Sequence, residues 1–454
     1  DFQGFRQWTD PKMTFGVFKA RRIRRFVNWR LILHQEIIAV LIFVLVLVTI
    51  MSEKLHRTSA ALGGTVLLLL TGILNVDKAI KYVDFNTIGV LVGMMLFVAV
   101  IKHSGLFEYI SIKAAKMAKG NPWKIMVAFM LITAICSAFL DNVTTVLLMG
   151  PMTITIAKMM KIDPLPILLG QIVSSNIGGT MTMIGDPPNI MIGSAANFAF
   201  IDFIQNTGIA CLAGLAVTIL GMKLVYKKKL VADEAAIEEI MNLDEDKAVS
   251  DRKLMHISVF MICMVIIAFM LHGNFGIESS SVALTAAAVM MIVGRQDIDE
   301  VVSDVEWPTI LFFFCLFIVV GGLVETGVIS QMAKFIMNLS GGHLVVTMLI
   351  LLWASAFLSA ILDNIPFVAT LIPLIIAMGK QGIDITPLWW AISLGACLGG
   401  NGTQIGASAN VVLCGIAGKN GYPISFNQYL KVGMPVMIVT VFIAMLFLLV
   451  RFAI

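Results

Sequence analysis

Long apolar runs follow one another along the chain and are separated by short polar segments. The hydrocarbon core of a bilayer, about 30 Å thick, is crossed by about 20 apolar residues in a helix, so runs that approach this length predict membrane helices. Such runs occupy residues 37–51, 60–74, 87–101, 208–226, 256–271, 281–293, 309–324 and 433–452. We therefore predict an all-α polytopic membrane protein that has membrane lipid among its partners.

The composition agrees with this pattern and excludes other classes. Of 454 residues, 59% are hydrophobic and 13% charged, and the mean hydropathy is +0.93. The formal net charge of +4, with basic loops such as "KKKL", indicates orientation in a membrane and no nucleic-acid partner. An enzyme needs a nucleophile with a base, or a metal cluster. The scattered histidines and the cysteines in apolar runs supply neither, so we predict no enzyme and no cofactor beyond a coupling ion.

The sequence repeats itself at a spacing of 222 residues, a signal of internal duplication. Identical residues stand at Ser59 and Ser281, Gly72 and Gly294, Asp77 and Asp299, Thr87 and Thr309, Gly105 and Gly327, Ser137 and Ser359, Asp141 and Asp363, Asn142 and Asn364, and Pro151 and Pro373. After a one-residue slip, "GGTMTMIGDPPNIM" aligns with "GGNGTQIGASANVV". We predict a basic segment 1–36, repeats 37–226 and 254–454, and a polar linker 227–253.

The stretch "SAFLDNVTTVLL" decides whether the repeats are parallel or inverted. Two full spans would give six crossings per copy and parallel repeats, whereas a re-entrant hairpin at 124–160 gives five and inverts the repeats. We favour the hairpin because its first limb is short, Lys124 and Lys158 mark both outer ends as water-facing, and the tip has no basic residue. The tips at Asp141 and Asp363 are then predicted to lie within the membrane and to face each other.

Glycines and prolines interrupt two further apolar segments. The first, at 164–200, contains "SSNIGGT" and "GDPPN", and the second, at 387–416, contains "LGGNGTQIG". A proline costs about 3 kcal/mol in a helix interior and a glycine about 1 kcal/mol, so both helices are predicted to unwind. The freed carbonyls can coordinate a cation and half-helix amino ends attract anions. Both breaks are therefore predicted binding sites.

Four motifs carry a resemblance to a known family: "SAFLDNVTTVLLMGPMTI", "SNIGGTMTMIGDPPNIMI", "LDNIPFVATLIPLI" and "LGACLGGNGTQIGASANVVLCGIAGKNGYPISF". From about His34 onward the chain resembles the P protein-like, citrate transporter-like members of the ArsB/NhaD branch of the ion transporter superfamily. The resemblance implies ten or eleven helices, two re-entrant hairpins, a scaffold that forms a homodimer, and an elevator-type transport domain. Dicarboxylate-carrying relatives bind carboxylates and sodium with Ser-Asn-Thr motifs. The Asp-Asn tips here depart from that pattern, because a carboxylate repels an anionic substrate unless a proton or a cation neutralises it.

Each repeat is thus predicted to contain scaffold spans, a hairpin, a broken helix and a final span. These are 37–104, 124–160, 164–200 and 208–226 in the first repeat, and 256–326, 344–379, 387–416 and 433–453 in the second. The candidate substrate- and ion-binding residues lie at the tips and breaks: Asp141, Asn142, Thr144, Thr145, Asn176, Gly178, Gly179, Thr180, Gly185, Asp186, Asn189, Asp363, Asn364, Gly399, Gly400, Asn401, Thr403, Gly406, Ser408 and Asn410.

Simpler explanations for these residues stay open. Asp141 and Asp363 could be only N-caps of helices, Asp186 could only shape the turn before two prolines, and the glycine pairs could only allow close packing. If sodium binds, we expect it at the Asp-Asn pairs of the two tips, Asp141 with Asn142 and Asp363 with Asn364.

We predict a secondary active transporter of a small ion or anion, coupled to protons or sodium, in a prokaryotic plasma membrane. Asp141 and Asp363 are expected to bind or exchange the coupling ion. The alternatives are an arsenite or antimonite efflux permease, or a Na⁺/H⁺ antiporter. A channel is a different class, which the doubled elevator plan disfavours.

Basic residues predict the orientation. With five crossings per copy, Lys54, Arg57 and the lysines of the loops near 113–124, 158–161 and 227–229 fall on one side, which the positive-inside rule makes cytoplasmic. The basic N-terminus would then be outside, unless a span precedes it or the segment 15–33 lies on or crosses the membrane. No cleavable signal peptide is evident.

Overall fold

The computed structural model describes residues 35–52 and 54–452, and this part of the chain is helical without any strand. Seven described helical stretches are long and apolar enough to cross a membrane: Phe85–Lys102, Pro122–Phe139, Phe200–Tyr226, Arg252–Phe275, Trp307–Glu325, Leu344–Ile361 and Phe426–Phe452. The prediction of an all-α polytopic membrane protein is confirmed. The predicted segments 1–36 and 15–33 lie almost wholly outside the described residues.

The helices follow the same order in both halves. The first half contains Gln35–Met51, α2 (Arg57–Leu70), α3 (Val76–Lys81), α4 (Phe85–Lys102), α5 (Leu106–Met117), α6 (Pro122–Phe139), α7 (Asn142–Met159), α8 (Leu165–Thr180), α9 (Pro187–Ala196), α10 (Phe200–Phe203), η1 (Ile204–Gly208) and α11 (Ile209–Tyr226). The second half contains α13 (Arg252–Leu271), η3 (His272–Phe275), α14 (Ser279–Gly294), α15 (Ile298–Ser303), α16 (Trp307–Glu325), α17 (Val328–Leu339), α18 (Leu344–Ile361), α19 (Asn364–Gly379), α20 (Thr386–Gly399), α21 (Ser408–Lys419) and α22 (Phe426–Phe452). The corresponding helices α7 and α19 of the two halves begin 222 residues apart, at Asn142 and at Asn364. The inverted orientation of the halves stays a prediction.

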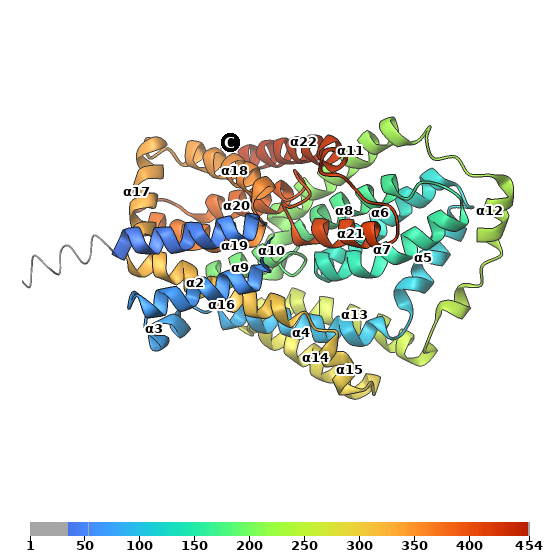
Figure 1. Cartoon of the computed structure of the whole chain (residues 1–454), viewed down its shortest axis with the longest axis horizontal. Coiled ribbons are helices and arrows are strands. Elements are labelled where there is room, and N and C mark those ends of the chain that lie inside the picture. Colours follow the sequence, from blue (N-terminus) through green and yellow to red (C-terminus); the bar gives the residue numbers. More distant parts are fainter. Residues whose placement is uncertain (1–34, 53, 453–454) are drawn as a thin grey trace, which may run out of the picture.

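Helices α2, α4, α13, α14 and α16, which precede the hairpins in the chain, lie in the lower part of Figure 1. Helix α4 packs along α14, and α2 packs along α16. Glycines allow this close approach, since a Cβ on Gly93 would lie 2.5 Å from the backbone carbonyl carbon of Ala283. We call Gln35–Met51, α2, α4, α13, α14 and α16 the scaffold group.

The predicted hairpins and broken helices form a second group, α6–α9 and α18–α21, which we call the hairpin group. Within each half, α6 packs along α8 and α18 along α20. Between the halves, α7 contacts α21 and α19 contacts α9. The second limb of each hairpin therefore lies against the second part of the broken helix from the other half.

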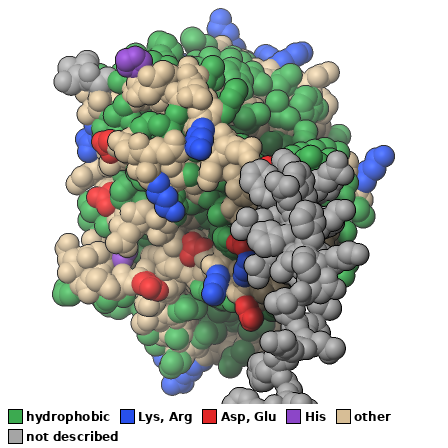
Figure 2. All heavy atoms as spheres, turned by 90° about the vertical axis from the view of Figure 1, so that its left-hand side faces the viewer, with side chains coloured by type: hydrophobic (Ala, Val, Ile, Leu, Met, Phe, Trp, Pro, Cys, Tyr) green, Lys and Arg blue, Asp and Glu red, His purple; other side chains and the backbone are tan. Residues whose placement is uncertain are grey.

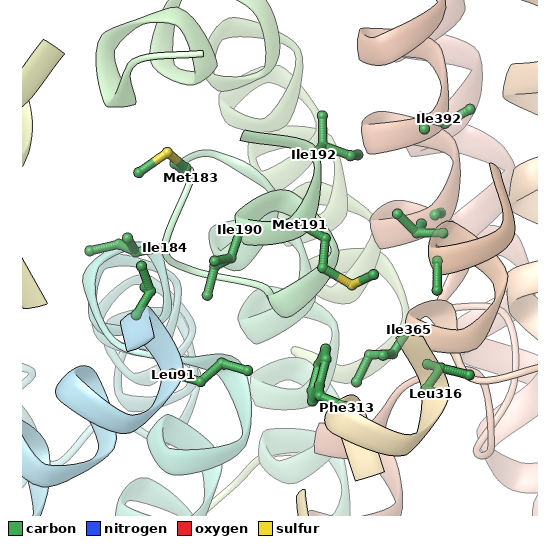
Figure 3. Close-up of a cluster of buried hydrophobic side chains, with 14 of the residues drawn as sticks. Leu91, Met183, Ile184, Ile190, Met191, Ile192, Phe313, Leu316, Ile365 and Ile392 are labelled. Carbon is green, nitrogen blue, oxygen red and sulfur yellow. The ribbon is translucent and has the colours of Figure 1, made fainter. Parts of the chain in front are cut away.

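A buried apolar cluster joins the two groups. Figure 3 shows Leu91 of α4 and Phe313 and Leu316 of α16 near Ile190 of α9 and Ile365 of α19. All five side chains are buried. Apolar contacts of this kind are non-directional, so they hold the groups together without themselves fixing one relative position.

The polar linker is more ordered than its composition suggested, since it contains helix α12 (Glu234–Met241) and the 3₁₀ turn η2 (Glu245–Ala248). Ala236 and Ile240, one helical turn apart, are buried, and Ile240 packs among apolar residues of the first half. Lys116 of α5 donates to the backbone oxygen of Leu243 at 2.9 Å and also pairs with Glu245. The hydrogen bond from Lys116 lowers the pKa of the Glu245 carboxyl. The linker is thus docked on α5.

The end of the molecule at the left of Figure 1 carries dispersed charges. Figure 2 shows acidic and basic side chains among apolar ones over this end, where α3 and α17 lie. Lys78 of α3 pairs with Glu325 at the end of α16, and Tyr82 donates to the same carboxylate at 2.9 Å. Charges at helix ends agree with an end that faces water.

Candidate ion-binding site

Each predicted hairpin turns at a leucine–aspartate pair. Leu140 and Asp141 have extended backbone between α6 and α7, and the Asp141 carboxylate accepts from the backbone N–H of Thr144 at 2.8 Å and from its hydroxyl. Leu362 precedes Asp363 in the same way, and Asp363 accepts from the N–H of Ile365 at 3.2 Å. Both aspartates therefore cap the second limb, as the simpler explanation required.

The two tips meet at Asp186, the residue before the two prolines of the first break. Asn142 donates to Asp186 Oδ1 at 3.2 Å, and Asn364 donates to Oδ1 and Oδ2 at 3.3 and 3.1 Å. The Asp186 side chain makes no cap bond to α9 and is 1% exposed. Asp186 therefore does more than shape a turn, because it joins both hairpins to the first broken helix.

Arg57, at the start of α2, reaches the second tip. Its Nη1 lies 3.1 Å from Asp363 Oδ2 and also contacts Ser408 Oγ, and its Nη2 donates to Thr309 Oγ1 at 3.0 Å. The guanidinium carbon lies 5.3 Å from the centre of the Phe312 ring. Ser408 in turn donates to Asp363 at 3.0 Å.

Sequence analysis counted Arg57 among the basic residues on one side of the membrane, and the structure adds that its guanidinium pairs with Asp363. A basic residue beside an apolar run is usually water-facing, but here Asp363, far along the chain, supplies a counter-charge that sequence spacing does not reveal. The one available signal was the mismatch between the copies, since the position 222 residues later is Ser279.

A pocket lies where the two tips approach the scaffold group. Its lining contains three carboxylates, one guanidinium, polar side chains and apolar walls: Arg57, Leu91, Met95, Asp141, Asn142, Val143, Asp186, Pro187, Glu306, Thr309, Asn364, Ile365 and Ser408. Asp363 lies beside it through its pair with Arg57. Three carboxylates thus share a largely apolar pocket with one guanidinium that a fourth carboxylate already pairs, and such an excess of carboxylates can bind protons or cations.

A buried asparagine network connects the breaks of the two halves. Asn176 of α8 donates to Asn401 at 3.0 Å and to Asn410 at 2.8 Å. Asn410 donates to the carbonyls of Gly400 and Thr403 at 2.7 and 2.9 Å. In the part of the chain that the structure describes, Asn176 Oδ1 and Asn401 Nδ2 have no partner.

The first break has the matching arrangement. Asn189 of α9 donates to the carbonyls of Thr180 and Thr182 at 3.2 and 2.9 Å. Its Oδ1 accepts from Ser393 of α20 at 2.7 Å and from the Cys397 thiol at 3.5 Å. Each asparagine therefore satisfies unwound backbone of its own half while it contacts the other half, a contact that the sequence did not predict.

The predicted glycines lie at close backbone contacts instead of in the pocket lining. A Cβ on Gly178 would lie 2.2 Å from the Ala134 oxygen, and one on Gly399 would lie 2.6 Å from that of Ala356. The pairs Gly179 with Gly185 and Gly400 with Gly406 touch each other across the two breaks. These contacts agree with the packing explanation, and binding of an ion or substrate at these glycines stays a prediction.

The predicted threonines also divide by environment. Thr180 donates to the carbonyl of Asn176 at 2.6 Å, and Thr403 donates to that of Ala360. The Thr144 hydroxyl bonds Asp141. Thr145 is buried and its hydroxyl has no partner among the described residues. Of the predicted set, Asp141, Asn142, Asp186, Asn364 and Ser408 line the pocket.

The described residues contain no group of three or more His, Cys, Asp or Glu side chains placed to hold a metal ion. A monovalent cation needs fewer carboxylates, because amide, hydroxyl and backbone oxygens complete its shell. The expected sodium site at the Asp-Asn tips therefore stays a prediction, and any ion there would draw on neutral oxygens.

Residues 47–395 match the family described as "Citrate transporter". An uncharacterized transporter of Mycobacterium tuberculosis, Rv2684, is 40% identical over 427 residues, which cover 92% of this chain and 99% of that protein. The human P protein is 30% identical over 501 residues, which cover 92% of this chain but 60% of that protein.

A solved structure shares the fold. The YdaH transporter of Alcanivorax borkumensis superposes with a TM-score of 0.58 at 14% identity, covering 81% of this chain and 86% of that one. The resemblance to P protein-like members of the ion transporter superfamily is confirmed. The matched span, the transporter relatives and the apolar helices together identify a multi-pass membrane transporter, and the chain belongs to the citrate transporter family.

Proposed function

We propose that this protein is a secondary active transporter in which protons or sodium ions bind at the pocket between the hairpin tips and drive the movement of a small ion or anion. The observation that carries the proposal is the convergence of Asn142 and Asn364 on Asp186 beside Asp141. A carboxylate there can bind either a proton or a cation, and this competition is the elementary step of coupled exchange.

The scaffold and hairpin groups support an elevator-type mechanism. The pocket lies between them, with Arg57 and Thr309 from the scaffold group and both tips from the hairpin group. The apolar contacts of Figure 3 would allow one group to slide past the other. A homodimer through the scaffold group and a prokaryotic plasma membrane complete the proposal, on the resemblance and on the mycobacterial relatives.

The charge of the pocket bears on the cargo. The family description names citrate, but a multiply charged anion would meet the carboxylates of Asp141, Asp186 and Glu306. We therefore expect an anion to enter only together with cations. The second candidate is a Na⁺/H⁺ antiporter, which the excess of carboxylates favours because the cargo is then itself a cation.

A flux panel in proteoliposomes tests the proposal. Labelled citrate, arsenite and ²²Na⁺ are offered separately, each under an imposed proton gradient and under an imposed sodium gradient. We expect one solute to accumulate in response to one gradient. Arsenite flux would instead favour the efflux permease, and flux that ignores both gradients in every case would overturn ion coupling.

A further inference from the structure

The Arg57 ion pair crosses the boundary between the two helix groups. Arg57 and Thr309 belong to the scaffold group, whereas Asp363 and Ser408 belong to the hairpin group. The guanidinium contacts Thr309 of its own group and, at the same time, Asp363 and Ser408 of the other group. Any displacement of the second tip along the scaffold group must therefore break this ion pair.

Among the described residues, the first tip has no such pair. Ser279 stands at the position that matches Arg57, and Pro187 at the one that matches Ser408. Asp141 bonds the backbone and hydroxyl of its own Thr144, and it forms no ion pair among the described residues. A tip with an aspartate cap can therefore form without a cation from the scaffold, so Arg57 serves a purpose other than building the hairpin.

The surroundings of the pair make its exchange with a dissolved cation feasible. The Arg57 and Asp363 side chains are 22% and 11% exposed, and Arg57 lines the pocket. If Arg57 leaves, a poorly solvated carboxylate remains, and this is costly unless another cation takes its place. The carboxylate of Asp363 and the hydroxyl of Ser408 are hard oxygen ligands, which suit a small monovalent cation such as Na⁺.

We propose that Arg57 is a tethered cation that occupies a sodium-binding position at Asp363 and Ser408, and that it latches the second hairpin tip to the scaffold until a dissolved cation displaces it. This inference rests on the proposed binding of cations in the pocket. It adds that the two tips are unequal, since among the described residues the second tip alone carries its own competitor.

The test uses the purified full-length chain in detergent and measures its thermal unfolding midpoint while NaCl replaces choline chloride at constant ionic strength. In Arg57→Gln the Na⁺ concentration for half-maximal stabilisation should fall about tenfold, the factor that corresponds to about 1.4 kcal/mol of lost competition. Arg57→Lys keeps the charge and should stay near the wild type. The double variant Arg57→Gln/Asp363→Asn should fold but lose the sensitised response.

Three results would overturn the inference. The first is a Na⁺ titration of Arg57→Gln that superimposes on that of the wild type, and the second is a double variant that keeps the sensitised response to Na⁺. The third is an Arg57→Gln protein that stays unfolded at every Na⁺ concentration, because Na⁺ should supply the missing positive charge. The proposed function fails on a different observation, namely wild-type flux that ignores both imposed gradients.

Discussion

Adding one methyl group at Gly178 should disrupt the packing that places the first break. A Cβ there would lie 2.2 Å from the oxygen and 2.6 Å from the Cα of Ala134, both in the backbone of α6. Because these are backbone atoms, no side-chain rotation relieves the clash, and α6 would have to move away from α8. Overpacking of this kind costs about 1–3 kcal/mol and occasionally more, against a gain of about 1 kcal/mol from replacing glycine in a helix.

Because the clash is with backbone atoms, the upper end of this cost applies, and we expect Gly178→Ala to lose about 2 kcal/mol of stability. Gly399→Ala, whose Cβ would meet Ala356 at 2.6 Å, should be destabilised for the same reason. The matched control is Gly418→Ala in α21, where no described atom lies within 4 Å of the added Cβ, and it should be neutral or slightly stabilised. The assay is the thermal midpoint of monodisperse protein on gel filtration. A Gly178→Ala protein as stable as Gly418→Ala would refute the reasoning.

Three further predictions follow from the same geometry. Asp141→Asn and Asp363→Asn should both fold, because asparagine caps a helix nearly as well as aspartate. Both variants should lose gradient-driven flux in proteoliposomes. Of the two, Asp363→Asn should melt at the lower temperature, since it leaves Arg57 without its counter-charge. Asn142→Ala and Asn364→Ala should each weaken the Asp186 contact, and their melting shifts in a double-mutant cycle should not add, because both donate to one carboxylate. Lys116→Met should expose the linker to limited proteolysis at neutral pH, because it removes the ion pair with Glu245. Lowering the pH should have the same effect in the wild type. Folding lowers the pKa of Glu245, so the stability from its ion pair with Lys116 is present above the unfolded-state pKa and is lost as the pH falls through the folded-state pKa.

The sequence predicted the general architecture well, because long apolar runs and breaks at glycine and proline are local signals. The break before Pro187 and the caps at Asp141 and Asp363 fall where residue chemistry alone places them. The partners of these residues were not predictable in this way. The approach of Asn364 to Asp186 joins positions 178 residues apart, and the pairing of Arg57 with Asp363 joins positions 306 residues apart.

The candidate site was predicted as one pool of polar residues, which the structure separates into different roles. Asp186 accepts from both tips, whereas Gly178 and Gly399 pack against backbone. A glycine pair looks the same in sequence whether it opens a site or brings helices together, because neither the neighbouring helix nor its distance is encoded locally. The role of each residue thus depended on contacts with helices that are distant in the sequence.

The central claim, that the acidic pocket binds the coupling ion, is tested most directly by the gradient dependence of flux in Asp186→Asn. The measurement takes the solute that the wild-type protein accumulates and compares its uptake under a proton gradient, under a sodium gradient and under neither. The exposed aspartates Asp77 and Asp299, changed to asparagine, are the matched controls. Folded Asp186→Asn protein should lose the response to the driving gradient while both controls keep it. Wild-type gradient dependence in Asp186→Asn would contradict the account.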